Sequence, residues 1–236
     1  IAFVVLQDSS GKMQVVLHKQ TLGENDYNNF FETSDVGDFF EFFGAVFTTK
    51  KGEESLKAET IRILTKSLLP LPEKFHGLTD LETRYRQRYL DLIANEDSMK
   101  LALSRAKMVR AMREFLEGNG FMEVETPILQ PIPGGANAKP FTTHHNTLHT
   151  DLYLRIAPEL YLKRLVVGGM EKVYEFARCF RNEGISPQHN PEFTQIEAYW
   201  AYATIEELID HLEGLVLAAL HAITDGKDEV VIDDTV

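Results

Sequence analysis

Short apolar runs separated by glycine-containing turns fill the first 66 residues of the chain. Runs of this length and composition are typical of β-strands. Joined by such turns, they predict a small barrel or sandwich. A phenylalanine-rich run over 39–47 is expected to fill its core. The candidate strands are 1–7, 13–17, 39–49 and 59–64.

A proline-rich break at 69–72 predicts a linker, and helical and strand-like periods alternate after it. Apolar residues recur at helical spacing over 98–117, with Ser98 as a candidate N-cap. Residues 173–181 and 192–201 are expected to pair as an antiparallel hairpin. The other expected elements are helices at 80–92, 158–168 and 205–223, strands at 121–126 and 152–156, and the start of a strand after 224.

These patterns predict an α+β chain with an antiparallel sheet in its larger part. We expect a β-barrel domain over 1–66, a linker with a helix over 67–97, and a second domain over 98–236.

The composition changes this picture little: 44% of the residues are hydrophobic and 25% are charged, as in ordinary globular domains. No apolar run approaches the roughly 18 residues of a membrane span, so we expect no membrane partner. The single cysteine, Cys179, excludes an internal disulfide and fits the cytoplasm. The net charge of −12 argues against indiscriminate nucleic-acid binding, although local basic clusters leave a nucleic-acid substrate open.

The predicted hairpin carries side chains that could bind a nucleotide on both sides of a turn at 184–187. The planar guanidinium of Arg181 can bridge a carboxylate and a phosphate. The ring of Phe193 can stack on a purine. Plainer explanations exist for each residue: a surface ion pair for Arg181 and Glu183, a solvated loop position for His189, and the core for Phe193.

Two runs of this hairpin, Phe180-Arg181-Asn182-Glu183-Gly184 and His189-Asn190-Pro191-Glu192-Phe193-Thr194, resemble motif 2 of class II aminoacyl-tRNA synthetases. The sequences of these two runs are most similar to those of the lysyl-type members of class IIb. Residues 121–127 resemble motif 1, which in this family forms the dimer interface, and 1–66 resemble the anticodon-binding OB barrel. The similarity extends over about 1–205. The other matching runs are 71–80, 84–92, 133–136, 155–164 and 196–199.

The resemblance implies a fold, a reaction and a set of site residues. The fold is an incomplete OB-type barrel followed by an incomplete class II catalytic domain. The reaction is the activation of L-lysine with ATP and Mg²⁺, followed by transfer to tRNA(Lys), in a cytoplasmic homodimer joined through motif 1. Arg181 is the implied catalytic residue. Implied ATP contacts are Arg181, Glu183, His189, Asn190 and Phe193; lysine contacts are Gly135, Glu159, Arg181, Glu197 and Tyr199; anticodon contacts are Phe3, Gln14 and Glu53.

Charge supports a cationic amino acid as substrate, because Glu159 and Glu197 flank Arg181 in the predicted elements. An aspartate-activating relative would instead need a cation for the substrate side chain. The simpler explanations are a carboxylate at a helix start for Glu159 and a charge on a sheet face for Glu197.

No run after Tyr202 matches the third motif of the family, a glycine-rich segment with an arginine. We therefore expect the chain to be part of a longer enzyme, with the Mg²⁺ ligands and the group that recognises the lysine ε-amine outside it, and we assign no metal ligand. The open alternatives are a non-catalytic tRNA-binding fragment or regulatory paralogue, and an aspartyl or asparaginyl relative of class IIb. A lysyl-transferase that modifies a translation factor is disfavoured, because such proteins lack the barrel.

Overall fold

The computed structural model describes residues 1–71 and 77–229. Residues 1–99 form one compact unit, and the described residues from Lys100 onward form a second. Residues 72–76, in the predicted linker, lie outside the described residues, and so does most of the strand expected after 224. The predicted domain limits at 66 and 97 stay predictions.

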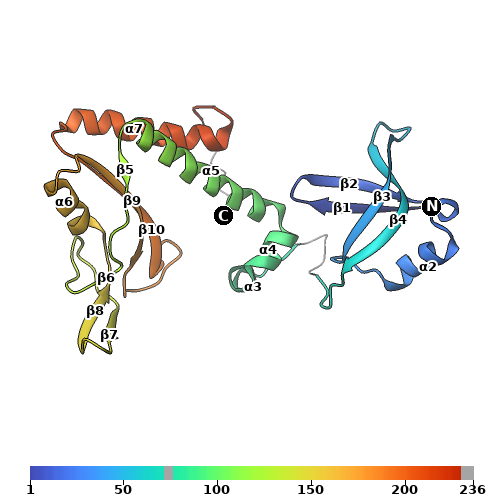
Figure 1. The fold of residues 1–236 in the computed structure, drawn as a ribbon, viewed down its shortest axis with the longest axis horizontal. Coiled ribbons are helices and arrows are strands. Elements are labelled where there is room, and N and C mark those ends of the chain that lie inside the picture. Colours follow the sequence, from blue (N-terminus) through green and yellow to red (C-terminus); the bar gives the residue numbers. More distant parts are fainter. Residues whose placement is uncertain (72–76, 230–236) are drawn as a thin grey trace. The chain divides into compact units, whose positions relative to one another are not determined.

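The first unit is built on a four-stranded sheet in the order β1-β2-β4-β3 (Figure 1). The pairs β1–β2 and β3–β4 are antiparallel, whereas β2 and β4 run parallel. Every strand predicted in this region is present, with somewhat different ends. The bounds are β1 Ala2–Asp8, β2 Gly11–Leu17, β3 Phe39–Thr48 and β4 Glu54–Thr65.

Two helices that the sequence did not predict, α1 (Lys19–Leu22) and α2 (Glu24–Thr33), connect β2 to β3. Their mean composition is polar, but Leu22 and Phe30 are buried and complete the core of this unit with Val15 and Leu17. Burial of these two side chains in the core therefore stabilises helices in a segment where the helical spacing of apolar residues is weak.

The expectation that the phenylalanine run fills the core is wrong for three of its members. Phe40 and Phe42 pack against the buried cluster. Phe39, Phe43 and Phe47 are exposed. Successive residues of a strand point to opposite faces of the sheet, so a continuous aromatic run cannot be buried on one side.

The single helix expected over 80–92 is divided at Gln87 into α3 (Leu81–Arg86) and α4 (Arg88–Ala94). The buried carboxylate of Asp91 binds Arg84 at 2.7 Å and Arg88 at 2.5 Å, which ties the two helices together. A third helix, α5 (Glu96–Gly118), follows directly.

The assignment of Ser98 as the N-cap of this helix is also wrong. Ser98 lies inside α5, and its hydroxyl oxygen accepts a hydrogen bond from Arg84 Nη2 at 3.1 Å. The tertiary contact to Arg84 thus uses the side chain that local sequence rules assign to capping.

The second unit contains two three-stranded sheets, in the orders β10-β9-β5 and β6-β8-β7. β9 and β10 form the predicted antiparallel hairpin, but β5 runs parallel to β9, so the first sheet is mixed. The strand expected over 121–126 is reduced to the two residues of β5. The bounds are β5 Met122–Glu123, β6 Leu129–Gln130, β7 Thr142–His145, β8 Thr150–Leu154, α6 Glu159–Val167, β9 Lys172–Phe180, β10 Glu192–Trp200 and α7 Ile205–Thr224.

One face of the β9–β10 hairpin packs against α5 and α7, which lie along it in Figure 1. The buried residues Leu116, Tyr174 and Leu215 join these elements. Gly214 permits the close approach of the two helices, because a Cβ there would lie 2.7 Å from the ring of Phe115. The helices therefore cover one face of the hairpin and leave its other face to the candidate site.

Candidate active site

The register of β9 and β10 decides which candidate residues share a face. Phe193 lies opposite Cys179, and Glu197 lies opposite Glu175. Cross-strand partners point to the same side of a sheet, and side chains alternate along each strand. Phe193, Glu197 and Tyr199 are therefore on one face, opposite to the side chains that pack on α5 and α7.

Arg181 follows the end of β9, where its backbone N–H donates to the carbonyl oxygen of Pro191 at 2.8 Å. The central carbon of its guanidinium lies 5.0 Å from the ring centroid of Phe193, within the range of a cation–π contact. Its Nε is buried and has no hydrogen-bond partner among the described residues. An unpaired buried donor is costly, so an anion bound here would gain an unused hydrogen bond.

The buried thiol of Cys179 lies on this face opposite Phe193. Its pKa is raised to about 11, mainly by burial; the carboxylates of Glu197 and Glu175 also raise it, while Arg155 and Arg181 lower it. Arg181 and Glu197 thus act on the same buried atom. The hairpin brings together a cation and a carboxylate that are separated along the chain.

The other candidate ATP contacts, Glu183, His189 and Asn190, are exposed. Glu183 Oε1 accepts from the backbone N–H of Lys139 at 3.1 Å, which ties the hairpin end to the preceding loop. His189 Nδ1 lies 2.7 Å from Ser186 Oγ within the turn. Asn190 is exposed beside it. The structure brings Arg181 into contact with Phe193, and no hydrogen bond or ion pair among the described residues links the other three to this pair.

Gly135 and Glu159 are neighbours in space. Gly135 has φ of +87°, and a Cβ on it would lie 2.8 Å from Glu159 Cβ and 3.2 Å from Ala157 Cβ. Only glycine permits this approach with this backbone conformation. Glu159 is the first residue of α6, where the helix dipole favours a negative charge.

Glu197 accepts hydrogen bonds from Gln195 Nε2 at 2.7 Å and from the Tyr199 hydroxyl at 3.1 Å. Burial raises the pKa of Glu197, and the negative charges of Glu159 and Glu175 add to this effect. Burial and the Glu197 carboxylate likewise raise the pKa of the Tyr199 hydroxyl. A cation bound between Glu159 and Glu197 would relieve their repulsion.

A buried charge network supports this face, and the sequence did not single it out. Arg155 and Glu175 are only 3% and 4% exposed, and Arg155 Nη1 lies 2.6 Å from Glu175 Oε1. The Thr126 hydroxyl donates to Glu175 Oε2 at 2.6 Å, and Arg155 Nε donates to the carbonyl oxygen of Arg178 at 2.8 Å. The network fixes the chain just before α6 to β9 beneath Glu197.

Lys163 belongs to the same surroundings. It is exposed on α6, and its Nζ lies 2.5 Å from Glu159 Oε1 and 5.9 Å from the ring centroid of Tyr199. The spacing of four residues from Glu159 on a predicted helix was the signal that could have found this pair.

Two of the three anticodon candidates share a face of the first unit. Phe3 and Gln14 belong to adjacent strands, and the register Phe3–Val16 and Val5–Gln14 puts them on the same side. Phe3 is 64% exposed, whereas Gln14 Nε2 donates to Ser55 Oγ at 2.9 Å. Glu53 is exposed in the turn between β3 and β4. An unpaired aromatic ring is thus available on the sheet surface.

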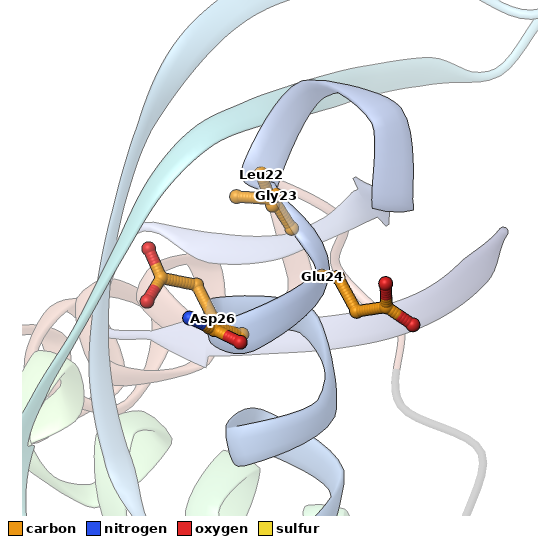
Figure 2. Close-up of a pocket in the computed structure, with 5 residues that line it drawn as sticks. Leu22, Gly23, Glu24 and Asp26 are labelled. Carbon is orange, nitrogen blue, oxygen red and sulfur yellow. The ribbon is translucent and has the colours of Figure 1, made fainter.

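The lining of a pocket in the first unit includes none of the three anticodon candidates. Figure 2 shows it at the junction of α1 and α2, lined by residues 22–26. The carboxylates of Glu24 and Asp26 point in different directions there, so they do not converge on one ligand.

Two further features are absent from the described ranges 1–71 and 77–229. No group of three or more histidine, cysteine, aspartate or glutamate residues is placed to hold a metal ion. None of the described helices combines the length and apolar character that crossing a membrane requires.

Comparison with known families defines the class of protein. Residues 80–235 match the tRNA synthetases of class II (D, K and N), and residues 1–64 match the OB-fold nucleic acid binding domain. The first match covers well over half of the chain, so the chain belongs to the class II tRNA synthetase family. The predicted fold class, an OB-type domain followed by part of a class II catalytic domain, is confirmed.

Individual relatives narrow the similarity to one kind of synthetase. A lysine–tRNA ligase of Serratia proteamaculans is 58% identical over 214 residues, covering 91% of this chain and 42% of that protein. One of Magnetococcus marinus is 51% identical over 227 residues, covering 96% and 45%. One of Pectobacterium atrosepticum is 58% identical over 234 residues, covering 99% and 46%. The lysyl-type resemblance is confirmed, and the chain spans less than half the length of these curated relatives.

The buried network yields a stability prediction. Glu175→Gln should lower the free energy of unfolding by about 3–5 kcal/mol, because it leaves the Arg155 guanidinium buried without a counter-charge. Glu192→Gln is the matched control: its ion pair with Arg178, at 3.4 Å, is exposed, and its loss should cost less than about 1 kcal/mol. Urea unfolding measures both, and equal losses would contradict the structural role of the network.

The raised pKa of Glu197 yields a pH-dependence prediction. The charged form is disfavoured in the folded state, so stability is lost as the pH rises from the unfolded pKa through the raised folded pKa. Glu197→Gln mimics the neutral form and should be more stable than the unsubstituted protein at pH 7. The difference should disappear below about pH 4, near the unfolded pKa of glutamate. Unfolding curves at several pH values test this, and a less stable variant at pH 7 would contradict it.

Proposed function

We propose that this chain belongs to a lysine–tRNA ligase, which activates L-lysine with ATP and transfers it to tRNA(Lys). In the first step the lysine carboxylate attacks the α-phosphorus of ATP, which gives lysyl-adenylate and pyrophosphate. In the second step the 3′ end of the tRNA attacks the lysyl carbonyl and releases AMP. The observation that carries the proposal is the buried, unpaired Nε of Arg181 on the face that also holds Glu197.

Arg181 is the residue that would act on the reacting atoms. Carboxylate and α-phosphate are both anions, so their approach requires a cation directed at the charge that develops in the transition state. A guanidinium can donate to both partners at once. Phe193 would hold the adenine beside it, and Glu183, His189 and Asn190 would provide the remaining ATP contacts.

Glu159 and Glu197 would recognise the amino acid. The two carboxylates repel each other, which favours a cationic ligand between them. Tyr199 and the backbone at Gly135 complete this part of the site. The compared relatives, at 51–58% identity, are lysine–tRNA ligases, which argues against the aspartyl and asparaginyl alternatives.

The first unit would supply tRNA selection. An exposed aromatic ring on a sheet of the OB type can stack on an unpaired base, and neighbouring polar side chains can read its edges. We assign Phe3 to stacking and Gln14 and Glu53 to hydrogen bonding with the anticodon. The acidic total charge then requires this contact to rest on stacking and local groups rather than on general phosphate attraction.

Three further attributes belong to the same proposal. The nucleotide would be used as its Mg²⁺ complex, and no group of metal-ligating side chains in the described part of the chain is assigned to that ion. The enzyme would be a homodimer joined through the segment 121–127. It would act in the cytoplasm, where Cys179 stays reduced.

A non-catalytic tRNA-binding role is the second candidate. The match of residues 1–64 to the OB-fold nucleic acid binding domain favours it, because such a domain can bind nucleic acid without catalysing a reaction.

Amino-acid-dependent pyrophosphate exchange tests the proposal on the full-length protein that carries this chain. Exchange should depend on L-lysine and be at background with aspartate or asparagine. Exchange with aspartate or asparagine and none with lysine would reject the assignment, and no exchange with any amino acid would favour the non-catalytic role.

Arg181→Ala should lower kcat/KM for lysine activation by about 10²–10³, because the developing charge then lacks its cation. Arg178→Ala removes a cation from the same hairpin, but Arg178 is exposed and pairs with Glu192 at 3.4 Å. This control should stay within about twofold of the unsubstituted enzyme, as for other exposed ion pairs. Equal effects of the two substitutions would remove the role assigned to Arg181.

A further inference from the structure

The ammonium of Lys163 lies at the acidic part of the candidate site. Its Nζ is 2.5 Å from Glu159 Oε1 and 5.9 Å from the ring centroid of Tyr199. Its charge also acts on Glu197, whose raised pKa it partly offsets. The three groups around this ammonium are those proposed above to recognise the amino acid, and the α-amine of the substrate is the group that the resemblance assigns to Glu159 and Glu197.

We propose that Lys163 is an internal substitute for the substrate amine: its ammonium neutralises Glu159 in the empty site, and the amine of the incoming amino acid displaces it. This inference rests on the proposed function, because it requires Glu159 to receive that amine. It adds a residue that tunes affinity and selectivity at the same site.

The physical reason for such a residue is the repulsion between Glu159 and Glu197. Without a cation, two neighbouring carboxylates shift towards protonation and lose their capacity to recognise an amine. Lys163 supplies such a cation to Glu159 until the substrate arrives. A ligand with a carboxylate but no amine cannot replace the ammonium, so the exchange favours ligands that carry both groups.

The exchange is feasible because the internal pair is weak. The side chain of Lys163 is 55% exposed, and it is joined to the helix by a flexible stem of four carbons. Exposed pairs at this helical spacing contribute little to stability. The ammonium can therefore turn into solvent when a better-placed amine binds.

A simpler function for the pair is helix stabilisation alone, and substitutions separate the two. Lys163→Met removes the competing ammonium, and Lys163→Arg keeps a cation in reach of Glu159. Arg164→Met is the matched control, because Arg164 occupies the adjacent position and lies over the ring of Tyr161, 4.7 Å from its centroid.

Isothermal titration of the full-length protein with L-lysine measures the effect. Lys163→Met should lower the Kd roughly two- to fivefold, the range that corresponds to loss of an exposed ion pair. Lys163→Arg and Arg164→Met should stay near the unsubstituted value. A Kd for Lys163→Met that is unchanged or higher would overturn the inference and leave the proposed function intact.

A second ligand identifies which group of the substrate competes. 6-Aminohexanoic acid is lysine without its α-amine, so it does not compete with Lys163 at Glu159. Its Kd should be the same for the unsubstituted protein and Lys163→Met. An equal gain for both ligands would overturn competition with the α-amine.

A ligand-free measurement separates failure of the inference from failure of the proposed function. Carbon-13 titration of the glutamate carboxyl groups should give a higher pKa for Glu197 in Lys163→Met than in the unsubstituted protein. No change would show that the ammonium does not act on the acidic pair, and would overturn the inference. The pKa change with no lysine binding by the unsubstituted protein would instead reject the proposed function, and with it the role of Lys163 as a substitute.

Discussion

The antiparallel register of β9 and β10 is the constraint on which the candidate site depends. It places Glu197 opposite Glu175 and Phe193 opposite Cys179, and a shift by one residue would turn Phe193 and Glu197 towards α5 and α7. The buried cluster on the helix side prevents such a shift, because Tyr174 and its neighbours would then enter the candidate site. Packing on one face therefore fixes the chemistry on the other.

The charged side chains on this face lie at different depths, and most of them are paired. At the base, Arg155 and Glu175 neutralise each other away from water and link the chain before α6 to β9. Above them, Glu197 is partly buried with a raised pKa, while Glu159 is paired with Lys163. Only Arg181 keeps a buried donor without a partner in the described part of this site. A site with an acidic side and an unpaired cation suits a ligand that carries an ammonium and a carboxylate.

The first unit uses the same alternation for another purpose. Ala2, Val4 and Leu6 pack inward, which leaves Phe3 and Val5 on the opposite, exposed side of β1. The exposed ring of Phe3, beside polar Gln14, leaves apolar surface in contact with water and does not contribute to the core of the unit. It is the kind of surface on which an unpaired base can stack.

Sequence alone was enough to predict the strands of the first unit, the β9–β10 hairpin and the family, because these depend on local period, turn residues and runs such as 180–184 and 189–194. It did not predict β6 and β7, α1 and α2, the division of the helix at Gln87, or the exposure of Phe39 and Phe43. Those features depend on burial and on contacts between elements, such as that of Asp91 in α4 with Arg84 in α3. The same holds for the site: the candidate residues could be named from motifs, whereas the buried pair Arg155–Glu175 and the approach of Lys163 to Tyr199 were decided only by tertiary packing, since each joins residues far apart in the sequence.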